Sequence, residues 1–290
     1  MTTNELDFLN IGADLNEMAV DAGGFRKVQH FNPNHTLHAK TSIADGGYGI
    51  KNELGDAPAL KNSKVETIKH QGGRQTIFRT TTELDVALIG WTSKYWVCEY
   101  DDPATPGKRV SNITADYFKP EDLPGTNAKC RQCITFFIVL HDDPERQLWA
   151  IDFRGFNVQE AEKLIFSAKA LANDVAKRAG VKVVHPFVHW LTMGVGEARL
   201  VGKQDQSLVC SPVWTKDGDN IRRAIVSKDD YAKFVDLRRE LDAFLPTSRY
   251  AVRNTAPALN APTNRPALNA PANGYRPLAN GADEGDEFNG

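Results

Sequence analysis

The chain has 290 residues, of which 41% are hydrophobic and 25% charged, a composition typical of a globular protein that folds without disulfides or metal. Its formal net charge is −2, so the chain lacks the overall basic character that usually marks a nucleic-acid-binding domain. The opening residues, MTTNELDFLN, include acids and no apolar run, which argues against a secretory signal, and no stretch reaches membrane-spanning length. We therefore expect a cytoplasmic protein whose four cysteines are reduced thiols or metal ligands, not a disulfide framework.

Charge is distributed unevenly along the chain. Residues 1–21 contain five acids and no Lys or Arg, whereas residues 61–79 contain five Lys or Arg and one acid, Glu66. Binding to a polyanion depends on a local basic patch more than on net charge. The composition therefore leaves nucleic-acid binding open.

The first part of the chain is rich in turn-forming pairs such as Gly46-Gly47. We expect residues 1–60 to form an irregular N-terminal arm that packs on the following domain. β-Branched and aromatic residues then predict strands at 75–79, 84–91 and 94–100. Several prolines and glycines predict a long loop over 101–129.

The middle of the chain has the clearest periodicity. Ile134–Leu140 (ITFFIVL) is a continuous apolar β run, and Gln147–Phe153 returns after an Asp/Pro turn, which predicts a β-hairpin. An apolar stripe of helical period predicts a helix over Asn157–Ala179, with Asn157 and Glu160 as its capping box and a glycine at its end.

Further elements complete the predicted domain. A second helix is expected near Lys228–Phe244, stopped by Pro246, after short β runs at 181–184, 187–193, 197–201 and 208–214. The order of strands, helix, strands and last helix predicts an α+β fold that is mainly β. Because a helix inserted between strands is compatible with an OB-fold, we expect residues 61–246 to form an OB-fold-like barrel with an inserted helix and a C-terminal helix.

The composition changes sharply after Pro246. Residues 247–281 are built mainly of Ala, Asn, Pro and Gly, and the block PALNAP occurs twice, so we expect a disordered linker. Residues 282–290 form an acidic tip with one aromatic ring, contributed by Asp283, Glu284, Asp286, Glu287 and Phe288. We interpret the tip as a hook that docks its ring into an apolar, Arg- or Lys-rimmed pocket of a partner. The alternative is a solubilising terminus.

This layout of linker, acids and Phe resembles the tails of bacterial and phage single-stranded DNA-binding proteins, which recruit replication and repair partners. It departs from the bacterial tails in having two further residues, Asn289-Gly290, after the Phe. A second resemblance covers about residues 100–210 and rests on a Cys-x-x-Asp, a Cys-x-x-Cys, a hairpin, a Phe-Arg-Gly-Phe turn and a long helix. This pattern is similar to phage and mobile-element proteins regarded as OB-fold single-stranded DNA-binding proteins with a zinc-ribbon insertion.

The cysteines are candidate metal ligands. Cys130 and Cys133 have the spacing of one zinc knuckle, and Cys98 and Cys210 could complete a four-thiolate site for one structural zinc. His141 or a loop Asp could replace Cys210. Alternatively, Cys98 and Cys210 are small core residues.

The candidate contacts with nucleic acid are aromatic rings interleaved with basic side chains, because single strands are held by stacking bases on rings while cations track phosphates. The segment Trp91–Trp96 (WTSKYW) places three rings and a lysine in six residues. Alternation favours Trp96 and Tyr100 as stacking rings and Trp149 as core. The full candidate set is Arg74, Arg79, Lys94, Trp96, Tyr100, Lys108, Arg109, Arg131, Arg154, Arg199 and Lys203.

No catalytic signature is present: the sequence contains no Walker motif, nucleophile elbow or His-Glu-x-x-His. We expect a non-catalytic, sequence-independent single-stranded DNA-binding protein acting in replication or recombination of a phage or mobile element, with replication or recombination proteins bound by the tip. Self-association is left open. The alternatives are a protein–protein adaptor or structural protein, and an annealing recombinase or nuclease subunit.

Overall fold

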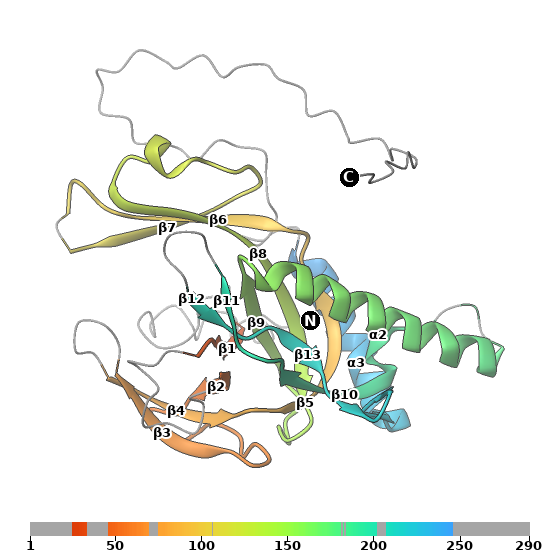
Figure 1. Ribbon diagram of the computed structural model, residues 1–290. Coiled ribbons are helices and arrows are strands. Elements are labelled where there is room, and N and C mark those ends of the chain that lie inside the picture. The colour runs from red at the N-terminus through yellow and green to blue at the C-terminus, as the bar shows by residue number, and fades with distance from the viewer. Residues whose placement is uncertain are drawn as a thin grey trace, which may run out of the picture. The chain divides into compact units, whose positions relative to one another are not determined.

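A computed structural model describes residues 25–33, 46–69, 75–105, 107–180, 182, 184–201 and 207–245. Within these ranges the chain is α+β and mainly β, with two α-helices (Figure 1). The expected linker 247–281, the acidic tip 282–290 and most of the N-terminal arm lie outside the described residues. The described part of residues 1–60 is not irregular as expected, because it contributes two strands to the main sheet.

Most strands belong to one sheet, whose main path runs β13-β10-β5-β8-β9-β1-β2-β4-β3. The strands on this path are β1 (Arg26–Phe31), β2 (Gly47–Lys51), β3 (Lys64–Lys69), β4 (Gln75–Thr81), β5 (Leu84–Trp91), β8 (Thr126–Leu140), β9 (Leu148–Arg154), β10 (His189–Val195) and β13 (Pro212–Trp214). Three more strands branch from it: β6 (Tyr95–Asp101) pairs with β8, β7 (Arg109–Thr114) with β6, and β16 (Arg223–Ile225) with β10. Two small hairpins stand apart, β11 (Arg199–Val201) with β12 (Ser207–Val209), and β14 (Lys216–Asp217) with β15 (Asn220–Ile221).

The sheet is mixed and open. The pairing of β1 with β9 is parallel, and the other pairings among the described strands are antiparallel. The path ends at β13 and at β3, and within the described residues no pairing joins these ends into a barrel. The predicted α+β, mainly β class is confirmed, whereas the expected barrel closure is not found.

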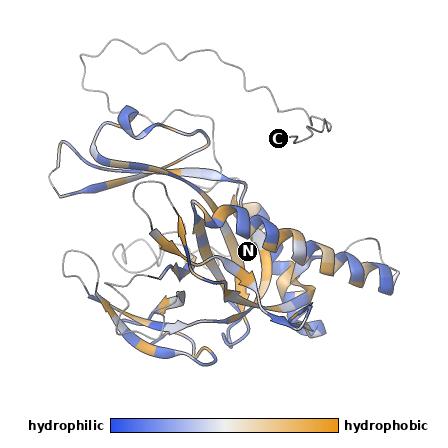
Figure 2. Ribbon diagram, in the orientation of Figure 1, coloured by the Kyte–Doolittle hydropathy of each residue, from blue (hydrophilic) through white to orange (hydrophobic). Residues whose placement is uncertain are grey.

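Strand β8 is the centre of the fold because both of its faces are covered. Its even-numbered residues Ile134, Phe136 and Ile138 pack in one core cluster with helix α2 (Asn157–Ala179). Its odd-numbered residues Phe137 and Val139 pack in a second cluster with helix α3 (Lys228–Phe244). A strand buried on both faces is continuously apolar rather than alternating, which explains the ITFFIVL run. Figure 2 shows the apolar residues concentrated in these central strands.

Both predicted helices are confirmed with the same bounds, but the predicted capping box of α2 is wrong. The N-cap of α2 is Phe156, without a side-chain hydrogen bond, and Asn157 is a buried helical residue whose Nδ2 lies 3.5 Å from Asn32 Oδ1. At the other end, Gly180 adopts a left-handed conformation with φ 66°, as expected for a C-terminal glycine. Helix α3 has a true cap, because Ser227 Oγ accepts from the Asp230 backbone N–H. Two short 3-10 turns, η2 (Pro120–Asp122) and η3 (Pro186–Val188), complete the described helical structure.

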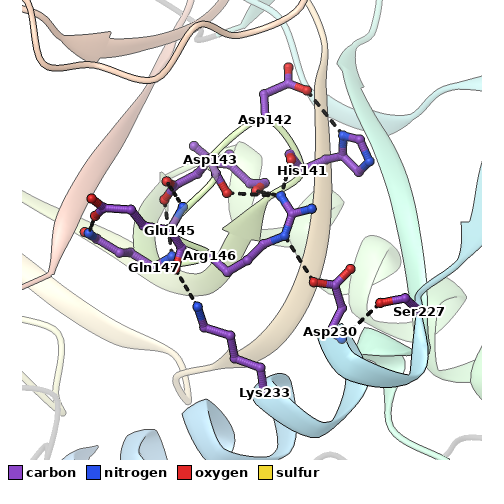
Figure 3. A network of polar contacts seen from close by, with 10 residues as sticks. His141, Asp142, Asp143, Glu145, Arg146, Gln147, Ser227, Asp230 and Lys233 are labelled. Atoms are coloured by element: carbon purple, nitrogen blue, oxygen red, sulfur yellow. Dashed lines mark hydrogen bonds and ion pairs between the residues drawn. The ribbon is translucent and has the colours of Figure 1, made fainter.

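The predicted β8–β9 hairpin is confirmed, and a polar network fixes its turn (Figure 3). The buried carboxylate of Asp143 accepts three hydrogen bonds, from the backbone N–H groups of Glu145 and Gln147 and from Trp149 Nε1. The guanidinium of Arg146 caps the turn and reaches Asp230 of α3. These contacts tie the turn to the core and to α3.

The region predicted as one long loop over 101–129 is wrong in part. It contains β7 and the start of β8, which pair on and beside β6. The described prolines of this region, Pro103, Pro120 and Pro124, lie in the connections between the strands, and β6, β7 and β8 contain none. We call β6, β7, the first half of β8 (126–133) and the connection 115–125 the wing (Figure 1).

Candidate nucleic-acid interface

The alternation of β6 gives the wing two faces with different chemistry. Trp96 lies opposite Gln132 of β8, an even-numbered residue, so Trp96 points to the face that α2 covers further along the sheet. Glu99 lies opposite Lys129, an odd-numbered residue, and points to the other face. We call these the aromatic face and the charged face.

Two tryptophans lie on the aromatic face, each beside another ring or a cation. Trp96 is half-buried, and its ring centroid is 4.8 Å from that of Tyr117, which is 51% exposed. Trp91 lies at the end of β5 and packs against the α2 core cluster, and Lys169 Nζ lies 4.8 Å above its ring. Lys94, in the turn between the two tryptophans, pairs with a glutamate of α2 at 3.0 Å.

The sheet register sets the spacing of the two tryptophans. Trp91 pairs with Phe136 and Trp96 with Gln132, so their partners are four residues apart on β8. At roughly 3.4 Å per residue, the two indoles are spaced about 14 Å apart along the sheet. Phe166 of α2 is 76% exposed and lies one turn from Lys169, so it extends the same surface. We call Trp91, Trp96, Tyr117 and Phe166, with Lys94 and Lys169, the aromatic surface.

Tyr100, the second predicted stacking ring, has a different environment. It is 9% exposed and packs in a small cluster with Cys98 and Leu123. A Cβ at Gly125 would lie 2.6 Å from the Tyr100 ring, so the chain covers this ring closely. Tyr117, which the sequence analysis missed, presents the exposed ring instead. Its position in a Pro- and Gly-rich segment gave no periodic signal.

The charged face carries an ion-pair ladder. N–O distances between successive members run from 3.0 to 3.8 Å, in the order Lys27, Asp152, Arg154, Glu99, Arg109 and Asp101. Burial opposes ionisation of Asp152, but Lys27, a hydrogen bond from Thr135 and Arg154 outweigh it and lower its pKa. The predicted contacts Arg109 and Arg154 are therefore already neutralised by carboxylates of the protein.

The other predicted cations are dispersed. Arg131 of β8 and Lys108 at the wing tip are exposed, and no acid among the described residues pairs with either. Arg199 lies 3.6 Å from Glu160 at the start of α2. Arg79 lies on β4, in the distant part of the sheet, with its Nε buried and without a hydrogen-bond partner.

The remaining predicted site residues lie outside the described residues: Arg74, Lys203 and the tip residues Asp283, Glu284, Asp286, Glu287 and Phe288. Of the predicted set, Arg109 and Arg154 meet at Glu99 and Lys94 lies two residues from Trp96 in the sequence, but the whole set is not gathered on one surface.

The four cysteines are not gathered at one point. Cys98 and Cys130 are opposite each other on β6 and β8, with Cα atoms 4.1 Å apart, and are joined as a disulfide, which corrects the expectation of reduced thiols. Cys133 is three residues along β8 and so faces the opposite side, where burial raises its pKa to about 12. Cys210 is buried elsewhere, with Sγ 3.8 Å from His30 Nε2, and burial raises its pKa to about 11.

A four-thiolate zinc site is therefore not formed in this structure. Within the described ranges, no group of three or more His, Cys, Asp or Glu side chains is placed to hold a metal ion. His141, the suggested replacement ligand, lies in the β8–β9 turn beside Asp142, at 3.3 Å.

Comparisons with known proteins do not assign the chain. No family model matches it, and neither the curated proteins nor the solved structures contain a match. In the described part of the chain, neither α2 nor α3 combines the length and the apolar character that a membrane crossing needs.

Proposed function

We propose that the protein binds single-stranded DNA without sequence preference, and that it does so on the aromatic surface. The observation that carries this proposal is the pair Trp91 and Trp96, on one face of the sheet, with Lys94 between them and Lys169 over one ring. Ring faces with adjacent cations are the combination that holds unpaired bases and their phosphates.

The geometry favours single strands over duplex. Bases in a duplex are stacked on one another and paired inward, so isolated protein rings reach them only when the strand is unpaired. Stacking is tolerant of base identity because each base has a π-face. Two rings about 14 Å apart along a sheet suit an extended strand rather than one groove of a regular helix.

The electrostatics favour stacking as the main source of affinity. Two lysines, Lys94 and Lys169, belong to the aromatic surface, and Lys94 is already paired with Glu162 at 3.0 Å. The expected log–log salt slope for a single strand is about −1.4 if both lysines contact phosphates and about −0.7 if Lys94 stays paired with Glu162. A role in replication or recombination of a phage or mobile element, with the acidic tip recruiting partner proteins, is part of the same proposal and is supported by the layout of the tail.

The test is fluorescence anisotropy of labelled oligo-dT across a salt series, with duplex of the same length as competitor. Trp96→Ala should weaken binding by about 1–3 kcal/mol, a loss of roughly fivefold or more, and Trp96→Phe should retain most of the affinity. Leu54→Ala is the matched control, because Leu54 is 75% exposed after β2 and away from the aromatic surface. Equal binding by wild type and Trp96→Ala would refute this location of the site.

A second function, as a protein–protein adaptor, is favoured by one observation. Phe166 and Tyr117 are large, exposed apolar groups on one surface, and Arg109 and Arg154 of the charged face are paired with acids. Exposed aromatic patches also serve as protein-binding sites. Absence of oligo-dT binding at low salt would make this the preferred function.

A further inference from the structure

Cys98 and Cys130 lie next to the aromatic surface. Cys98 follows Trp96 by two residues on β6, and Cys130 precedes Gln132, the partner of Trp96, by two residues on β8. Residues two apart on a strand point to the same face. The cysteine pair and Trp96 are therefore neighbours on the aromatic face.

The disulfide also belongs to the cluster of side chains that holds the segment around Tyr117. Cys98 forms a cluster with Tyr100 and Leu123, against which Phe118 and Cys130 pack. Phe118 thus anchors the 115–125 connection on the cysteine pair, and the preceding residue, Tyr117, contacts Trp96. The order of this connection and the geometry of the Trp96–Tyr117 contact therefore depend on the same small cluster.

We propose that Cys98 and Cys130 form a reversible thiol–disulfide pair that sets the order of the 115–125 connection, and with it the strength of nucleic-acid binding on the aromatic surface. The effect on the order of the connection does not depend on the proposed function, whereas the effect on nucleic-acid binding rests on it. The disulfide form orders the Trp96–Tyr117 contact, and the dithiol form loosens it.

The chemistry is thiol–disulfide exchange with a low-molecular-weight thiol or disulfide. In oxidation, one cysteine thiolate attacks a small disulfide and displaces one thiolate, and the second cysteine then attacks the mixed disulfide and displaces the other. The Cys98–Cys130 bond forms, the small disulfide is reduced to two thiols by two electrons, and the two cysteine protons end on these thiols. Reduction is the reverse reaction.

The solvent exposure of Cys130 and the burial of the other two cysteines both support Cys98 and Cys130 as the pair that exchanges. Cys130 is half-buried and Cys98 is 1% exposed, so an external thiol reaches the pair through Cys130. Cys133 and Cys210 are buried, and burial raises the pKa of each thiol, so neither provides a thiolate that competes. The exchange is therefore confined to one pair.

Reduction should leave the fold intact. The backbone pairing of β6 with β8 extends from Tyr95 to Asp101 and does not depend on the sulfur bond. The change is limited to the side-chain layer and the 115–125 connection. Since ordering an interface side chain costs a modest entropy, the dithiol form should bind oligo-dT about two- to tenfold more weakly.

The experiment compares full-length protein, oxidised with glutathione disulfide or reduced with a phosphine, in two assays. Hydrogen–deuterium exchange of peptides over 109–125 reports the order of the connection, and oligo-dT anisotropy reports binding. Titration of thiols in the unfolded protein verifies the states, with two thiols when the pair is oxidised and all four cysteines free when it is reduced. We expect faster exchange and weaker binding in the reduced protein, and the same phenotype without reductant in the double variant Cys98→Ser, Cys130→Ser.

Cys210→Ser is the matched control, because it removes a buried thiol and leaves the pair, so it should keep the redox response. Chemical reduction of the wild type keeps the test valid if the double variant fails to fold. Equal exchange and equal binding in both states would overturn the inference while the proposed function stands. If neither state binds oligo-dT, the proposed function and the effect on binding fail, and hydrogen exchange alone decides whether the pair orders the connection.

Discussion

The β8–β9 turn offers the sharpest test of the energetics, through Arg146 (Figure 3). Its Nε donates to Asp230 Oδ1 at 3.2 Å, with both side chains 22% exposed, and its NH1 donates to the Asp143 carbonyl at 3.0 Å. The guanidinium carbon also lies 5.0 Å from the ring centre of Trp190. One side chain therefore joins the turn, α3 and a core tryptophan.

The magnitude follows from these contacts. A charged hydrogen bond to the turn carbonyls contributes about 1.5–3 kcal/mol, the cation–π contact about 0.5–1 kcal/mol, and the partly exposed ion pair less than about 1 kcal/mol after solvent screening. These terms are not additive, so we expect Arg146→Ala to lower the free energy of unfolding by about 2–4 kcal/mol. Arg146 has φ 53°, in the left-handed region, so Arg146→Gly loses the same contacts but relieves about 1 kcal/mol of backbone strain.

The assay is urea unfolding followed by tryptophan fluorescence and circular dichroism. The variants should shift the midpoint with an unchanged m-value, and Arg146→Gly should lie between wild type and Arg146→Ala. Arg239→Ala is the control, because its pair with Asp236 is exposed at 75% and 68% and contributes little. A change below about 0.5 kcal/mol for Arg146→Ala would show that the network adds no net stability and refute this reasoning.

Three further outcomes follow from particular contacts. Burial lowers the folded-state pKa of His30, and burial with a nearby arginine that of His189, from 6.5 to about 4 in each case. The unfolded chain therefore takes up protons first, and stability measured by urea unfolding should fall as pH drops from about 6.5 to 4, whereas these two histidines add no further change above about pH 7. Gly46→Ala should lower the melting temperature sharply, because φ is 102° and the new Cβ would overlap the Cys210 sulfur. Arg109→Ala should leave oligo-dT affinity within about twofold, because two carboxylates already pair with it, and a larger loss would place phosphates on the charged face.

Elements encoded by local periodicity were predicted from the sequence. Helices α2 and α3 have long amphipathic stripes, and the β8–β9 hairpin has two apolar runs around an Asp/Pro turn, so each signal lies within a short window. Strand β7 (RVSNIT) has two apolar positions, Val110 and Ile113, whose spacing of three does not match the alternation of a strand, and it pairs with β6 along its length. A strand that is stabilised by pairing with another strand does not need a periodic pattern in its own sequence.

The prediction of a zinc site from the cysteine spacing depended on the backbone conformation of the Cys-x-x-Cys segment, which the spacing does not show. A Cys-x-x-Cys grips one metal when a turn brings both thiolates to the same side. Here both cysteines lie inside β8, where an offset of three residues sends Cys130 to one face and Cys133 to the other. The residue opposite Cys130 then decides its chemistry, and that residue is Cys98. Spacing along the chain could not show this, because the partner comes from another strand.

The alternation of side chains between the two faces of the sheet also explains how a chain of net charge −2 can bind a polyanion under this proposal. Counting basic residues on the charged face overstates its positive field, because Arg109 and Arg154 alternate there with Glu99, Asp101 and Asp152. The aromatic face holds fewer cations, but they lie beside rings. Affinity on such a face derives from stacking and depends weakly on salt, whereas a basic groove would depend on it steeply. The salt slope and the loss of affinity in Trp96→Ala are therefore linked: a shallow slope with a large loss supports the aromatic surface, and a steep slope with no loss would assign binding to cations elsewhere on the chain.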